Sequence, residues 1–141
     1  MVSYLFDTNV ISELVRTEPD AAVLDWFAHT PDEALFLSVL TLGEIRKGIG
    51  KLSDSLRREK LRVWLEHDLR DWFGPRVAPI GAGVADQWGR LLAKAARPVP
   101  AIDSLLAAMA LQHGLRLVTR NGKNFDHAGL EVINPWETAF N

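Results

Sequence analysis

Short apolar runs, each ending at a polar side chain, alternate along this chain with amphipathic stretches. The runs cover residues 2–6, 35–39, 77–80, 115–119 and 130–133. Continuous apolar runs of this length, rich in branched and aromatic side chains, are typical of strands buried on both faces. Strands that alternate with helices predict a mostly parallel sheet with helices on both sides. We therefore expect an α/β fold of three layers, in which a central sheet of four or five strands is flanked by helices.

Helical periodicity fills the intervals between the runs. A short helix is expected after the first run, capped by Thr8 or Asn9, and another near Pro19. The further helical stretches begin at about residue 41 and cover residues 53–73, 84–96 and 102–112. Gly114 is suited to end the last of them, because glycine accepts the left-handed conformation of a helix C-terminus.

The chain has 141 residues, no internal repeat and no linker-like tract, so residues 1–141 are interpreted as a single domain. The absence of cysteine excludes a disulfide framework, a thiolate zinc site and a cysteine nucleophile. No basic leader precedes an apolar stretch, and no run approaches the ~20 apolar residues that a spanning helix needs. We expect a cytoplasmic protein that does not enter a membrane.

Three acidic residues fall near the starts of elements on one side of the expected sheet. Asp7 directly follows the first strand, Glu44 lies early in the helix after the second, and Asp103 opens the helix after two prolines. In open parallel sheets, ligands bind beyond the carboxyl ends of the strands. Each acid also has an ordinary interpretation, as a helix cap or as a solvated helical residue. Only the three together indicate a site.

Carboxylates gathered in one cleft repel one another unless a cation joins them. Oxygen ligands without Cys or paired His suit Mg²⁺ or Mn²⁺ and not zinc. Such an ion lowers the pKa of a bound water and stabilises the leaving oxygen of an in-line displacement. The three acids therefore point to hydrolysis of a phosphodiester.

The motifs around these acids resemble those of the PIN-domain ribonucleases, and in particular those of the VapC- or FitB-type toxins. The matching segments, in order, are LFDTNVISEL at 5–14, SVLTLGEIRKG at 38–48, IDSLLAA at 102–108, LVTRN at 117–121 and VINPW at 132–136. Their order and spacing hold over essentially the whole chain. The resemblance implies a PIN-like, Rossmann-like fold in which Asp7, Glu44 and Asp103 fall on the family's metal-binding acids.

The same resemblance implies a biological setting. It implies a Mg²⁺- or Mn²⁺-dependent endoribonuclease that cuts single-stranded regions of RNA and is the toxin of a type II toxin–antitoxin pair. It also implies a homodimer, and a cognate antitoxin protein with which it forms a heterotetramer or a larger complex.

The sequence departs from the family pattern at the fourth acidic position. Many members carry an acid just after the strand that ends at Thr119, or a little later before a Phe. Here Asn121 and Asn124 occupy those places, and Asp126 follows Phe125. Whether Asn121 or Asp126 fills the role stays open, and Asn121 would support the attacking water or the acids. Asn9 and Thr119 are further candidate supporting residues.

Three cationic residues near the acids, Arg46, Lys47 and Arg120, are candidate contacts for RNA phosphates. Two other functions remain possible at this stage. One is a catalytically weak or inactive PIN-like protein that acts through its partner surface, which the Asn at the fourth position motivates. The other is a phosphotransfer domain with Asp7 as nucleophile, which would expect a second Asp where Asn9 stands.

Overall fold

A computed structural model describes residues 1–137 of the chain and contains the expected parallel sheet. The sheet is five-stranded, its order is β3-β2-β1-β4-β5, and every neighbouring pair is parallel. Its strands are β1 (Tyr4–Phe6), β2 (Leu35–Ser38), β3 (Val77–Ala78), β4 (Arg116–Val118) and β5 (Val132–Ile133). Strand order reverses at β1, from which β2 and β4 extend to opposite sides. The expected fold class is confirmed.

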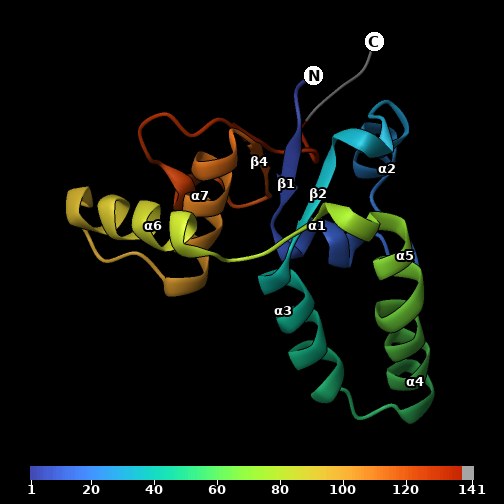
Figure 1. The fold of residues 1–141 in the computed structure, drawn as a ribbon. Helices are drawn as coiled ribbons and strands as arrows, with labels where there is room; N and C mark the ends of the chain where they lie inside the picture. The colour runs from blue at the N-terminus through green and yellow to red at the C-terminus, as the bar shows by residue number, and fades with distance from the viewer. Residues whose placement is uncertain (138–141) are drawn as a thin grey trace.

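Seven α-helices connect the strands of the described part of the chain (Figure 1). They are α1 (Thr8–Glu13), α2 (Ala21–Ala28), α3 (Val39–Gly50), α4 (Ser55–Val63), α5 (Arg70–Phe73), α6 (Ala82–Lys94) and α7 (Ala101–His113). Short 3₁₀ turns cover Asp32–Ala34, Gly74–Arg76 and Gly122–Phe125.

Each face of the sheet is covered by its own apolar cluster. Phe6 and Val118 belong to a cluster with α1, α2 and the helices around α5, whereas their neighbours Leu5 and Leu117 pack with α6 and α7. Leu5 pairs with Leu117 and Phe6 with Val118, so consecutive residues alternate between the two cores. Burial on both faces explains why the strands are continuous apolar runs.

Several helix boundaries differ from the expectation by one or two residues, and the clearest differences are at the start of α1 and within the stretch 53–73. Asp7, rather than Thr8 or Asn9, is the N-cap of α1, because its backbone is still extended and its N–H bonds to the carbonyl of Val118 at 2.9 Å. The stretch 53–73 is interrupted, since a π-helical segment, Trp64–Leu69, separates α4 from α5. Gly114 does end α7, in the left-handed conformation with φ of 64°.

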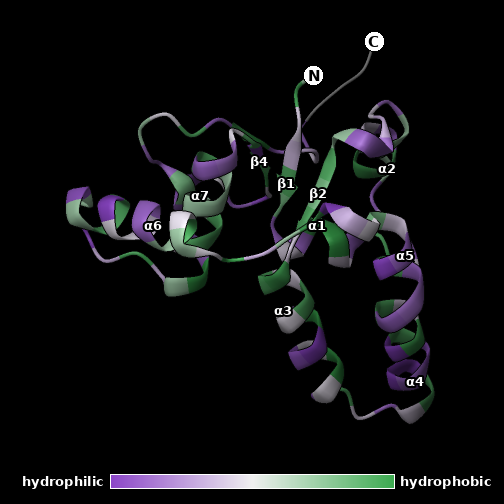
Figure 2. Ribbon diagram, viewed as in Figure 1, coloured by the Kyte–Doolittle hydropathy of each residue, from purple (hydrophilic) through white to green (hydrophobic). Residues whose placement is uncertain are grey.

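Helices α3 and α4 project together away from the sheet and meet at a loop at their far ends (Figure 1). No residue of α4 is buried, and the helix is largely hydrophilic (Figure 2). Within residues 1–137, no helix is long and apolar enough to cross a membrane.

Candidate active site

Asp7 lies where the carboxyl end of β1 passes into α1, and its carboxylate is held on both oxygens. Oδ1 accepts the backbone N–H of Thr8 at 2.8 Å, and Oδ2 accepts the hydroxyl of Thr119 at 2.9 Å. Thr119 itself follows β4 and is fully buried. Asp7 is 8% exposed, so this carboxylate is fixed in direction and largely withdrawn from water.

The environment of Asp7 disfavours its charged form. Burial raises the pKa of the Asp7 carboxyl, the bonds from Thr119 and Thr8 act in the opposite direction, and the negative charges of Asp103 and Glu44 raise it further. The charges of two acids from distant elements therefore reach Asp7. We refer to Asp7, Glu44 and Asp103 below as the acidic cluster, because their charges act on one another across this edge of the sheet.

Glu44 projects from α3 toward α1, where the hydroxyl of Thr8 donates to its Oε1 at 2.6 Å. The Thr8 hydroxyl also lies 3.2 Å from that of Thr41, which is fully buried beside Glu44 on the same helix. Because Thr8 is adjacent to Asp7, a single residue links two of the acids. The sequence had suggested Thr8 only as a cap.

Asp103 lies in the first turn of α7 and is half-buried. Burial raises the pKa of its carboxyl, and the charge of Glu44 adds to the effect. The next residue, Ser104, is fully buried, accepts the indole N–H of Trp88 at 2.9 Å and donates to the carbonyl of Ala101 at 2.9 Å. These bonds fix the first turn of α7 against α6 and so position Asp103.

The candidate supporting residues surround Asp7 on the side of β4. The amide of Asn9 lies 3.4 Å from Oδ2 of Asp7, and its carbonyl oxygen accepts the backbone N–H of Arg120 at 3.4 Å. The backbone N–H of Asn121 donates to the Thr119 hydroxyl at 3.1 Å. Asn121 is thus tied to the site by its main chain, while its side chain is exposed.

Asp126 lies apart from the cluster. It follows the 3₁₀ turn Gly122–Phe125 and is exposed on a groove beside α6. Its charge is not among those that act on Asp7 or Asp103. In the described part of the chain, Asn121 is bonded through its main chain to Thr119, whereas Asp126 has no such bond to the site.

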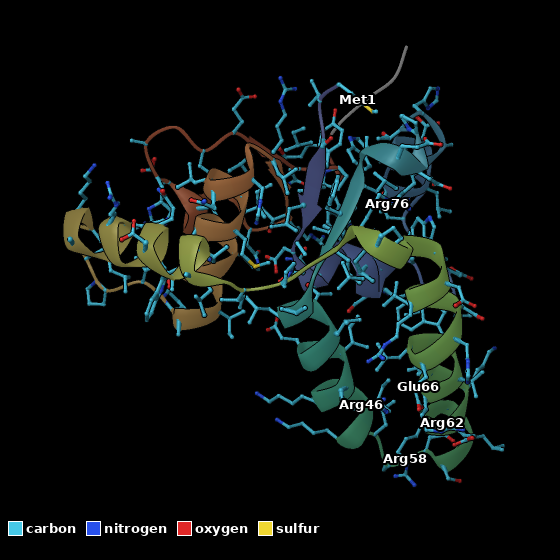
Figure 3. The ribbon with its side chains drawn as sticks, viewed as in Figure 1. Met1, Arg46, Arg58, Arg62, Glu66 and Arg76 are labelled. Atoms are coloured by element: carbon cyan, nitrogen blue, oxygen red, sulfur yellow. The ribbon has the colours of Figure 1, made fainter. Side chains whose placement is uncertain are left out.

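The three candidate phosphate contacts differ in their surroundings. Arg46 turns toward the π-helical segment and pairs with Glu66 at 3.7 Å, in the space between α3 and α4 (Figure 3). The guanidinium of Arg120 stacks over the ring of Trp136, 4.9 Å from its centroid. Lys47 is exposed on α3.

The acids fit a divalent cation by chemistry, although their side chains do not enclose one. All the donors are carboxylate or amide oxygens, the ligands that Mg²⁺ and Mn²⁺ accept. Among residues 1–137, no three or more His, Cys, Asp or Glu side chains are arranged as a metal site. Oε1 of Glu44 instead accepts the hydroxyl of Thr8.

A parallel α/β sheet with acidic residues at its carboxyl edge indicates the class of protein to which this chain belongs. Comparison with known proteins identifies that class. The PIN domain family model matches residues 4–130, so the chain belongs to the PIN domain family. The resemblance inferred from the motifs is therefore confirmed.

Three curated relatives match over nearly their whole lengths. The plasmid stability protein StbB of Pseudomonas syringae pv. tomato is 43% identical, over 94% of this chain and 98% of its own. VapC ribonuclease Y4jK of Sinorhizobium fredii is 37% identical, over 96% and 99%. Toxin FitB of Neisseria gonorrhoeae is 33% identical, over 94% and 97%.

A solved structure gives the same result for the fold. The chain superposes on the structure of FitAcB from Neisseria gonorrhoeae with a TM-score of 0.90 and 33% identity, over 96% of this chain and 99% of that one.

Proposed function

We propose that this chain is a metal-dependent endoribonuclease that hydrolyses phosphodiester bonds in single-stranded regions of RNA. The observation that carries the proposal is a PIN domain in which Asp7, at the carboxyl end of β1, is joined through Thr8 to Glu44 of α3. The relative named VapC ribonuclease Y4jK supports the reaction class. We propose that residues 1–141 act as one domain, in the cytoplasm.

Asp7, Glu44 and Asp103 would hold Mg²⁺ or Mn²⁺. When bound, such an ion activates a water and stabilises charge on the leaving oxygen. The chain's own contribution is positioning: Thr119 and Thr8 fix the two oxygens of Asp7, and Thr8 also holds Glu44 beside it. Asn121 offers an uncharged amide at the rim, which would orient the water or a phosphate oxygen.

The biological role we propose is that of the toxin in a type II toxin–antitoxin pair. A relative named toxin FitB, 33% identical over nearly its whole length, supports it. The partner would be a cognate antitoxin protein, and the toxin itself a homodimer within a heterotetramer or a larger complex.

A catalytically weak protein that acts through its partner surface is the second candidate. Two observations favour it: the amide of Asn121 at the position of the fourth acid, and the lack of a closed set of acidic ligands within residues 1–137. An activity measurement separates the two candidates.

The test is cleavage of single-stranded RNA in the presence of Mn²⁺. We expect Asp7→Asn to reduce the rate by about 100-fold or more, because it removes a charged ligand at the centre of the cluster. The matched control is Asp68→Asn, which alters an exposed acid in the π-helical segment. Undiminished cleavage by Asp7→Asn would contradict the mechanism, and no cleavage by the unaltered protein would favour the second candidate.

A further inference from the structure

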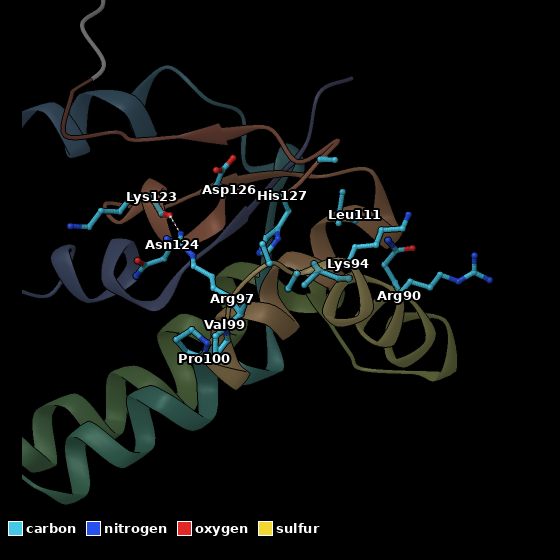
Figure 4. Close-up of a pocket in the computed structure, with 16 residues that line it drawn as sticks. Arg90, Lys94, Arg97, Val99, Pro100, Leu111, Lys123, Asn124, Asp126 and His127 are labelled. Atoms are coloured by element: carbon cyan, nitrogen blue, oxygen red, sulfur yellow. Dashed lines mark hydrogen bonds between the residues drawn. The ribbon is translucent and has the colours of Figure 1, made fainter.

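A groove of about 950 Å³ lies beside α6, outside the acidic cluster. One wall is the end of α6 with residues 95–100, and the other lies within the segment 123–128 (Figure 4). The two walls touch where the guanidinium of Arg97 lies 3.5 Å from the carbonyl oxygen of Lys123. The groove is therefore formed by parts of the chain that are distant in sequence and meet only in the fold.

The lining of the groove is strongly cationic. Lys94, Arg97 and Lys123 are exposed on it, and none forms an ion pair with an acid in the described part of the chain. Arg90 lies one helical turn before Lys94 and pairs with Asp86 at 2.8 Å, on an exposed surface where such a pair is easily exchanged. Asp126 is the sole acid among the described residues of the lining. The groove is thus suited to a ligand with repeated negative charges.

The lining also has an apolar portion. Val99, Pro100 and Leu111 supply apolar surface against which a ribose or a base can pack. Repeated negative charges together with apolar parts on one ligand describe a nucleotide chain.

Both walls of the groove adjoin the candidate site along the chain. Pro100, at the end of one wall, lies three residues before Asp103, and Lys123, on the other, lies two residues after Asn121. The segments that line the groove therefore lead, in sequence, into the segments that carry the candidate site.

We propose that this groove binds the sugar-phosphate backbone of the single-stranded RNA that flanks the scissile phosphate. Lys94, Arg97 and Lys123 contact the phosphates, and the inference rests on the proposed ribonuclease function. Lysine and arginine side chains that neutralise phosphates release the counterions of the RNA, so that binding weakens as salt rises. For single strands the slope of log K against log salt changes by about 0.7 for each phosphate contact.

The test measures binding separately from cleavage. An Asp7→Asn background prevents cleavage, and fluorescence anisotropy follows a short labelled single-stranded RNA as salt rises from roughly 50 to 200 mM. We compare Lys94→Gln/Arg97→Gln/Lys123→Gln with Arg58→Gln/Lys60→Gln/Arg70→Gln, which removes the same charge from exposed positions on α4 and α5. All six side chains are exposed, so both variants should fold, which a melting curve verifies.

We expect the groove variant to bind about tenfold more weakly at low salt, with a salt slope smaller by about 2, while the control variant keeps the slope. Asp126→Asn should act in the opposite sense and bind RNA more tightly, because it removes the one repelling charge of the lining.

Three outcomes would overturn the inference. An unchanged salt slope in the groove variant would leave the proposed ribonuclease function intact and contradict only the binding of RNA in the groove. Weaker binding of a polyglutamate peptide, with unchanged RNA binding, assigns the groove to an acidic protein segment. If the Asp7→Asn protein binds no RNA even with all three cationic side chains of the groove in place, the proposed function is contradicted, and the inference fails with it.

Discussion

Thr8 is the residue that couples the acids to one another. Its backbone N–H binds Asp7 and its hydroxyl binds Glu44 at 2.6 Å, so one short side chain sets the relation between β1 and α3. Hydrogen-bond partners that orient ligands without binding the metal themselves often change metal affinity by about 10–100-fold. Thr8 is therefore a positioning residue for the proposed metal site.

Replacement of Thr8 by valine, which keeps the shape and removes the hydroxyl, tests this role. We expect Thr8→Val to raise the Mn²⁺ concentration for half-maximal RNA cleavage by about tenfold, because Glu44 loses the bond that holds it beside Asp7. Thr8→Ser is the matched control and should behave like the unaltered protein. Equal metal dependence in the two variants would show that the contact does not matter.

Replacement of glycine by alanine should have different effects at two positions, one at the end of a helix and one inside a helix. Gly114 ends α7 with φ of 64°, a conformation that strains any residue with a Cβ. Gly89 lies inside α6, where an added Cβ meets nothing within 4 Å. The first position needs glycine, and the second does not.

We therefore expect opposite effects on the free energy of unfolding. Gly114→Ala should lower it by about 1 kcal/mol through backbone strain. Gly89→Ala should raise it by about 0.5–1 kcal/mol through higher helix propensity. Urea denaturation of both variants measures the difference, and a shift of the same sign in both would contradict this interpretation.

At the element level, the sequence predicts the strands and helices well. The sheet could be predicted because strands buried on both faces must be apolar along their whole length, as Leu5 and Phe6 are. The π-helical segment could not, because one wider turn leaves the apolar spacing of Trp64, Leu65 and Leu69 compatible with an ordinary helix.

Contacts between distant segments were the harder part to predict. Asp7, Glu44 and Asp103 could be placed at one sheet edge, since the carboxyl ends of parallel strands meet there. The bond from Thr8 to Glu44 depends on how α3 leaves the sheet. The groove depends on the approach of Arg97 to Lys123. No local sequence pattern encodes how α3 leaves the sheet or how Arg97 approaches Lys123.

For the whole molecule, the acidic cluster links stability to pH and to metal. Burial and mutual repulsion raise the pKa of Asp7 and of Asp103 above the ordinary value of 3.8. A carboxyl with a raised pKa in the folded state contributes its full stability below that ordinary value, and this contribution is lost as pH rises through the folded-state pKa. Without metal, these two acids therefore make the protein less stable at pH 7 than at mildly acidic pH.

A bound divalent cation should reverse this loss. A ligand at ten times its Kd adds about 1.4 kcal/mol to the free energy of unfolding. For a chain of this length, that corresponds to a rise in Tm of roughly 4–6 °C. The rise should be large at pH 7 and vanish as the carboxyls become protonated.

The central claim is that Asp7, Glu44 and Asp103 form one divalent-cation site, and its most direct test is the melting temperature with and without Mg²⁺ between pH 4 and pH 8. We predict that Mg²⁺ raises Tm only toward neutral pH. We also predict that Asp7→Asn raises Tm in EDTA at pH 7 and abolishes the response to Mg²⁺. Equal Mg²⁺ responses in the unaltered protein and in Asp7→Asn would contradict the claim.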